Sequence, residues 1–221
     1  MPWLLKQIIY LSVILLAPVT GFIKWRSLSK AFKTLSVLLL TTFLFETTAV
    51  FSAYVFKNNA LVYDIFDPAE VLLFTYVFAN LFKRNPAKKI ITAIGISIVL
   101  IIIFSSVFFV PGILINTLSV VIKSIFFIIL SLLKFRNMLA EPNYESVVKE
   151  PVFWLCTAVL LFFTINILFW SAYNYLSHTH TKIGGSFIDI LYYSNIVFYL
   201  MLWYCFVVIK KNRRYYNNTN G

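Results

Sequence analysis

Lysine and arginine occur in four clusters, and the chain between the clusters is almost entirely apolar. The clusters are Lys24/Arg26/Lys30/Lys33, Lys83/Arg84/Lys88/Lys89, Lys134/Arg136/Lys149 and Lys210/Lys211/Arg213/Arg214. Each interval between clusters accommodates two apolar segments of about 20 residues, the length that crosses the ~30 Å hydrocarbon core of a bilayer as a helix. One further apolar segment precedes the first cluster. This pattern predicts a chain of membrane-spanning helices.

The composition supports a membrane environment and argues against nucleic acid as a partner. Hydrophobic residues make up 61% of the chain and charged residues 12%, about half of the ~25% that is usual in a soluble domain. The net charge of +11 would suggest nucleic-acid binding in a soluble protein. Here the positive residues are confined to one set of loops, where they orient the helices and meet anionic lipid. We therefore expect membrane lipids, and no nucleic acid, as partners.

The predicted fold is all-α, a single bundle of seven transmembrane helices over residues 1–209 with a basic tail at 210–221. The expected spans are 5–23, 34–56, 68–82, 90–110, 113–133, 151–174 and 187–209. Pro18 is expected to kink the first helix, which we interpret as an uncleaved span. Pro111-Gly112 predicts a tight turn between the fourth and fifth spans.

The distribution of positive charge predicts the orientation of the bundle. All Lys and Arg residues except Lys6, Lys57, Lys123 and Lys182 fall in the loops that follow spans one, three, five and seven. Positive residues mark the cytoplasmic side, so we expect the N-terminus outside and the C-terminus inside. The predicted location is the inner membrane of a bacterium, as a multi-pass protein.

Three charged residues fall inside predicted spans, where charge is costly and usually serves a function. Glu46, Glu70 and Lys123 each lie 11–13 residues from the nearest inner basic residue, roughly 16–20 Å above the cytoplasmic rim at 1.5 Å per residue. Asn166 and Asn195 fall at roughly 22 Å by the same arithmetic, with Tyr192 close by. We therefore predict one polar layer that could bind a ligand, formed by Glu46, Glu70, Lys123, Asn166, Tyr192 and Asn195.

The same residues also have structural interpretations. Lys123 is expected to face inward and to neutralise Glu46 or Glu70, and Asn166 and Asn195 are expected to act mainly as hydrogen-bonding contacts between helices. The run Asp67-Pro68-Ala69-Glu70 resembles a helix start, with Asp67 as N-cap and Glu70 closing a capping box. If the helix began earlier, Asp64, Asp67 and Glu70 would instead form an acidic stripe on one face.

Other candidate sites are weaker. His178 and His180 form an H-x-H pair in the predicted outer loop, but two ligands without a third do not define a metal site. Asp189 is expected to cap the seventh helix or contact that loop. The sequence contains no familiar nucleophile, zinc or nucleotide motif, so no catalytic residue, metal or cofactor is assigned.

A resemblance to small bacterial seven-helix integral membrane proteins of no established function rests on three features. These are Glu46 in the second span, Asn59 with Tyr63 before Glu70, and Phe153-Trp154 at the start of the sixth. The resemblance implies an architecture only.

The favoured functional interpretation is a non-enzymatic membrane protein that binds a small or lipidic ligand in the polar layer. It could equally report to a cytoplasmic signalling partner through the loop at 134–150. The alternative is an intramembrane lipid hydrolase that uses Glu46 and Glu70 as acid and base, and a small transporter is the third possibility.

The predicted orientation has a direct test. A reporter fused at Gly221 should be active only if it is of a kind that works in the cytoplasm, because the basic loops hold that end inside. An alkaline phosphatase fusion, which needs the periplasm, should be inactive there. Phosphatase activity at Gly221 would contradict the orientation.

Overall fold

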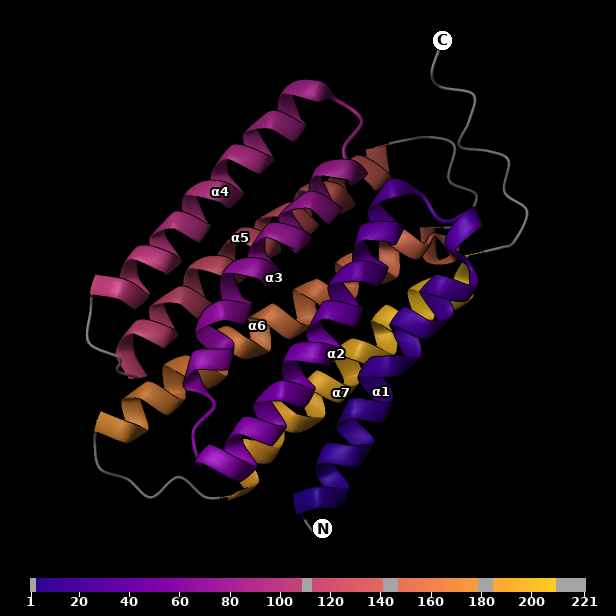
Figure 1. The fold of residues 1–221 in the computed structure, drawn as a ribbon. Coiled ribbons are helices and arrows are strands. Elements are labelled where there is room, and N and C mark those ends of the chain that lie inside the picture. The colour runs from indigo at the N-terminus through magenta and orange to yellow at the C-terminus, as the bar shows by residue number, and fades with distance from the viewer. Residues whose placement is uncertain (1–2, 109–112, 141–146, 179–184, 210–221) are drawn as a thin grey trace.

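The computed structural model describes residues 3–108, 113–140, 147–178 and 185–209, and these residues fold into long α-helices (Figure 1). The α-helices are α1 (Trp3–Ile23), α2 (Lys30–Phe56), α3 (Ala60–Leu81), α4 (Asn85–Phe108), α5 (Ile113–Ala140), α6 (Pro151–His178) and α7 (Gly185–Val208). Two short 3-10 turns, Trp25–Ser27 and Val147–Lys149, follow α1 and precede α6. The all-α prediction is confirmed.

Most helices pack against their neighbours in the chain. Helix α1 lies against both α2 and α7, α3 lies against α2 and α4, and α6 lies between α5 and α7. Helix α4 touches α5 much less than it touches α3, and Figure 1 shows α4 at one edge of the bundle. The backbones of α3 and α5 approach each other at few points, so side chains must bridge them.

The start of α3 corrects the sequence prediction. The helix begins at Ala60, eight residues before the predicted start, and Pro68 lies inside it. The earlier start arises from Asn58, whose side-chain oxygen accepts a hydrogen bond from the Ala60 N–H at 2.9 Å. Pro68 lacks the N–H that would pair with the carbonyl four residues earlier, yet the helix continues. The predicted capping box at Asp67 and Glu70 is therefore wrong, and both residues lie within the helix.

The other boundaries agree with the predicted spans more closely, except at the end of α5. This helix continues to Ala140, so the first part of the predicted 134–150 loop is helical. Pro18 lies inside α1 and is buried. The predicted turn at Pro111-Gly112, the middle of that loop at 141–146 and the basic tail at 210–221 lie outside the described residues.

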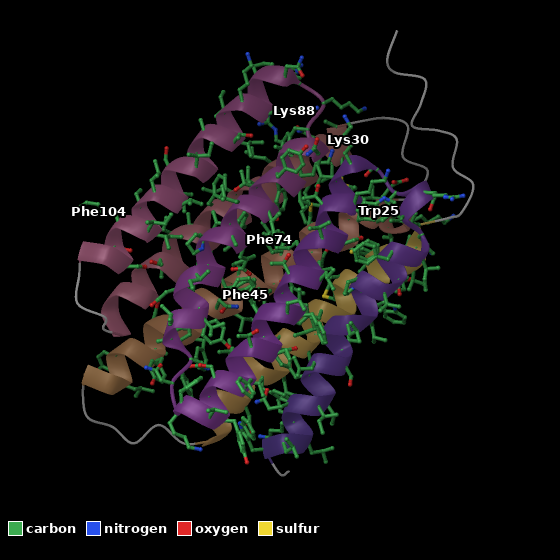
Figure 2. All side chains as sticks on the ribbon, in the orientation of Figure 1. Trp25, Lys30, Phe45, Phe74, Lys88 and Phe104 are labelled. Atoms are coloured by element: carbon green, nitrogen blue, oxygen red, sulfur yellow. The ribbon has the colours of Figure 1, made fainter. Side chains whose placement is uncertain are left out.

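A column of aromatic side chains runs through the apolar core. The Phe127 ring of α5 lies 5.3 Å from that of Phe74 in α3 and 5.1 Å from that of Phe163 in α6. Phe198 of α7 continues the column 6.4 Å from Phe163. Figure 2 shows Phe74 among the helices. Such pairs contribute about 0.5–1.5 kcal/mol each beyond the burial of their area, so the column ties four helices together.

The outside of the bundle is apolar, as expected for a surface that meets lipid. Helix α4 alone exposes Ile90, Ile94, Leu100, Ile101 and Phe104 by 46–61%, and soluble monomers rarely expose so large an apolar patch. Five described helices (α1, α2, α4, α6 and α7) contain segments long and apolar enough to cross a membrane. The remaining two, α3 and α5, contain Glu70 and Lys123 of the predicted polar layer, whereas Glu46 lies in α2.

Basic side chains gather at one end of the bundle, where they satisfy helix carbonyls. Lys24 Nζ donates to the carbonyls of Phe206, Val207 and Ile209 at the end of α7, at 2.7, 3.2 and 2.9 Å. Lys134 Nζ donates to the Leu81 carbonyl at the end of α3, at 3.0 Å. Figure 2 shows Lys30 and Lys88 toward this same end. Cations are favourable there because the last carbonyls of a helix lack partners within the helix.

A glycine sets the distance between α3 and α4. A Cβ added at Gly95 would collide with the Thr75 side chain, so the two helices approach closely only because residue 95 has no side chain. Because α4 packs mainly on α3, this contact is important for its position.

Gly95→Leu should therefore destabilise the protein by about 1–3 kcal/mol through overpacking, measured as a lower melting temperature in detergent. Ala93→Leu is the matched control, since Ala93 lies on the exposed face of the same helix, and it should leave the melting temperature nearly unchanged. Equal effects of both substitutions would contradict the close α3–α4 contact.

Candidate functional site

A buried lysine bridges two carboxylates between α5 and α3. Lys123 Nζ lies 2.8 Å from Asp67 Oδ1 and 2.8 Å from Glu70 Oε2. The Lys123 and Glu70 side chains are 9% and 13% exposed, and that of Asp67 is 24% exposed. Asp67 and Glu70 are three residues apart on α3 and therefore share one face of that helix. We call these three residues the ion triad.

The ion triad confirms part of the sequence prediction and corrects the rest. Lys123 faces inward and pairs with Glu70, as one of the two predicted alternatives required. It does not pair with Glu46, and the second partner, Asp67, had been assigned to a helix cap. The spacing of Asp64, Asp67 and Glu70 was the available signal, because it becomes a stripe once α3 starts at Ala60.

Glu46 occupies a separate position, bounded by tyrosines. The Tyr63 hydroxyl of α3 donates to Glu46 Oε2 at 3.3 Å, and the Tyr10 hydroxyl of α1 also interacts with this carboxylate. The Tyr10 ring lies 6.0 Å from that of Tyr199 in α7. Within the described part of the chain, no lysine or arginine pairs with Glu46. Residues from α1 and α3 therefore meet the Glu46 carboxylate of α2, and Tyr199 of α7 lies beside one of them.

The surroundings of Glu46 are only partly closed. On α2, Thr42 and Ala49 precede and follow Glu46 on the same face, and they are 3% and 1% exposed. Glu46 itself is half-buried, and Tyr63 is 38% exposed. Packing is thus tight on either side of Glu46 along the helix, whereas Glu46 itself and its partner Tyr63 are more exposed.

Asn166 and Asn195 do not join these groups. Their side-chain Nδ2 atoms donate to carbonyls of their own helices, Phe162 O at 2.9 Å and Leu191 O at 2.8 Å. Among the described residues, neither forms a hydrogen bond to another helix, so their predicted role as interhelical contacts is not supported. Asn166 is nevertheless buried at 7% exposure.

Tyr192 lies near the start of α7, where it contacts the start of α1. Its hydroxyl donates to the Lys6 carbonyl at 3.1 Å, and Lys6 Nζ lies 2.6 Å from Asp189 Oδ1. Asp189 therefore pairs with α1 rather than capping its own helix, which corrects the prediction. The Tyr192 ring still lies 6.3 Å from that of Tyr10, so it borders the tyrosines around Glu46.

The sequence prediction missed Tyr10, Tyr63 and Tyr199 as site residues. Tyr63 had been noted only as part of a resemblance, and a tyrosine in an apolar span gives no signal of what its hydroxyl will meet. Among the described residues, no group of three or more His, Cys, Asp or Glu side chains is placed to hold a metal ion. His180 lies outside those residues.

Comparisons with protein-family models, curated proteins and solved structures return no match for this chain. The function is therefore inferred from the geometry of the site.

Removal of Lys123 should be strongly destabilising, because it leaves two carboxylates without their buried partner. Lys123→Met should reduce the free energy of unfolding by about 3–5 kcal/mol, seen as a lower melting temperature in detergent. Adding Asp67→Asn and Glu70→Gln to Lys123→Met should recover part of the loss, because the repelling charges are then gone.

Lys89→Met is the matched control, since Lys89 is exposed near the start of α4, and it should have little effect. If the effects of the three ion-triad substitutions simply add, the residues do not interact as described.

Proposed function

We propose that this chain is a seven-span protein of a bacterial inner membrane that binds a small or lipidic ligand at Glu46. The N-terminus lies outside and the C-terminus inside. In support, five helices are apolar enough to span a bilayer. The other two supply the ion triad, which neutralises much of their buried charge. The basic side chains at one end agree with a cytoplasmic face.

This proposal is based mainly on one difference among the acidic residues of the bundle, namely which partners they have. Asp67 and Glu70 share the Lys123 ammonium, whereas Glu46 is met by tyrosine hydroxyls only. A carboxylate away from bulk water is costly unless a partner stabilises it. Among these three residues, Glu46 is thus the one that lacks a positively charged partner and could bind one. It is also only half-buried.

A lipid hydrolase that uses Glu46 and Glu70 remains the alternative, but it fits this geometry less well. Such an enzyme needs both carboxylates at the scissile bond. Glu70 is 13% exposed at its side chain and bonded to Lys123, so it is engaged in a structural contact. The proposed role is therefore binding, without a chemical step.

The two glutamates should respond differently to the same substitution. Glu46→Gln should leave the melting temperature nearly unchanged and abolish ligand retention, because Glu46 makes no ion pair. Glu70→Gln should lower the melting temperature, because it removes one side of the ion triad. The measurements are thermal melting in detergent and native mass spectrometry of molecules that stay bound through purification.

The hydrolase alternative would show a different result, namely turnover of lipid that is lost in both variants. A Glu46→Gln protein that retains the same bound molecules as the wild type would contradict a binding role for Glu46.

A further inference from the structure

The groups around Glu46 also indicate the chemistry of the ligand. We propose that the Glu46 site takes an organic cation, a primary amine or a quaternary ammonium group, held between the carboxylate and the surrounding tyrosine rings. This inference rests on the proposed function and goes further by naming the class of ligand.

The charge of this region of the bundle favours a cation. Glu46, Asp67 and Glu70 place three carboxylates in this region of the bundle, against one lysine, Lys123. Lys123 is committed to Asp67 and Glu70 at 2.8 Å each, so the region can accept a further positive charge. An anionic ligand would be repelled by the same carboxylates, and a neutral one would leave Glu46 without a counter-charge.

Tyrosine side chains lie next to Glu46. Tyr63 contacts Glu46 from α3, Tyr10 contacts it from α1, and the Tyr199 ring lies 6.0 Å from that of Tyr10. The faces of aromatic rings attract alkylated ammonium groups, and this attraction strengthens when the site is desolvated. Tyr63 and Tyr10 thus place aromatic side chains next to the Glu46 carboxylate, where an organic cation would lie beside them.

Metal ions, the other class of cation, fit the Glu46 site less well. Calcium takes six to eight oxygen ligands and magnesium an octahedral set. Glu46 is a single carboxylate whose neighbours are tyrosine hydroxyls, and the described residues contain no suitable group of three ligands for a metal. An ammonium group needs fewer ligands, because ring faces and one carboxylate suffice.

The geometry also gives a direction of approach. Tyr10 and Tyr199 are 9% and 6% exposed and form the closed side, while Tyr63 is 38% exposed. The cation would thus reach Glu46 past Tyr63, near the start of α3. The ammonium group could belong to a lipid headgroup such as ethanolamine or choline, or to a free amine. The following experiment distinguishes these two sources.

The test uses the full chain in nanodiscs of phosphatidylglycerol, a lipid without an amine. Free choline and ethanolamine are compared with the uncharged analogues 3,3-dimethylbutan-1-ol and propan-1-ol by calorimetric titration. In a second arm, native mass spectrometry counts phosphatidylethanolamine, phosphatidylcholine and phosphatidylglycerol bound to the detergent-purified protein. Binding of a free amine identifies a soluble ligand, and retention of the amine lipids alone identifies a headgroup.

The expected result is a preference for the cation over its uncharged analogue, or for an amine lipid over phosphatidylglycerol. Glu46→Gln should weaken this binding about ten- to a hundred-fold. Tyr63→Leu should weaken it roughly three- to thirty-fold, and Tyr63→Phe much less, because the ring is retained. Asp64→Asn is the matched control, since it removes a half-buried carboxylate next to Tyr63 in the chain and should change the affinity little.

Two results would overturn the inference and leave the proposed function intact. One is equal binding of a cation and its uncharged analogue. The other is Glu46-dependent retention of a neutral or anionic molecule with no response to amines. If no molecule of any class binds in a Glu46-dependent manner, the proposed function is overturned as well.

Discussion

The contact between Lys123 and the two carboxylates of α3 is a polar bridge between two helices whose backbones approach at few points. Lys123 Nζ lies 2.8 Å from both Asp67 Oδ1 and Glu70 Oε2. Removing one member of such a buried set leaves an uncompensated charge. Helix α4 packs mainly on α3, so its position depends indirectly on the same contact. The aromatic column around Phe127 and the Lys134 bond to the end of α3 reinforce this junction.

The ion triad also explains why Glu46 differs from the other buried carboxylates. With Lys123 committed to α3, Glu46 relies on the hydroxyls of Tyr63 and Tyr10. Hydroxyl donors satisfy a carboxylate oxygen but do not cancel its charge. Under the proposed function, stability and binding belong to different residues within one region. This separation is what allows substitutions at Glu46 and Glu70 to distinguish the two roles.

Much of the fold could be predicted from the sequence, whereas the site could be predicted only in part. Apolar segments bounded by basic clusters identified every long helix, because bilayer thickness fixes the length of a span. The start of α3 was missed because Asp67-Pro68 resembles a helix start, whereas Asn58 provides the start in this chain. Depth along each span correctly brought Lys123 and Glu70 together. The same depth also included Asn166 and Asn195, which bond within their own helices, since depth does not determine the direction in which a side chain points.

The sequence by itself determined the helical class, the approximate bounds of most helices and the position of the charged residues along them. It also placed the basic residues at the ends of α1, α3, α5 and α7, where helix carbonyls need donors. Only the tertiary structure decided which carboxylates Lys123 would take and that Tyr10, Tyr63 and Tyr199 would gather near Glu46. The physical reason is that pairing depends on the rotation of each helix about its axis and on which helices are neighbours. Packing between helices sets both of these, and no local pattern in the chain encodes them.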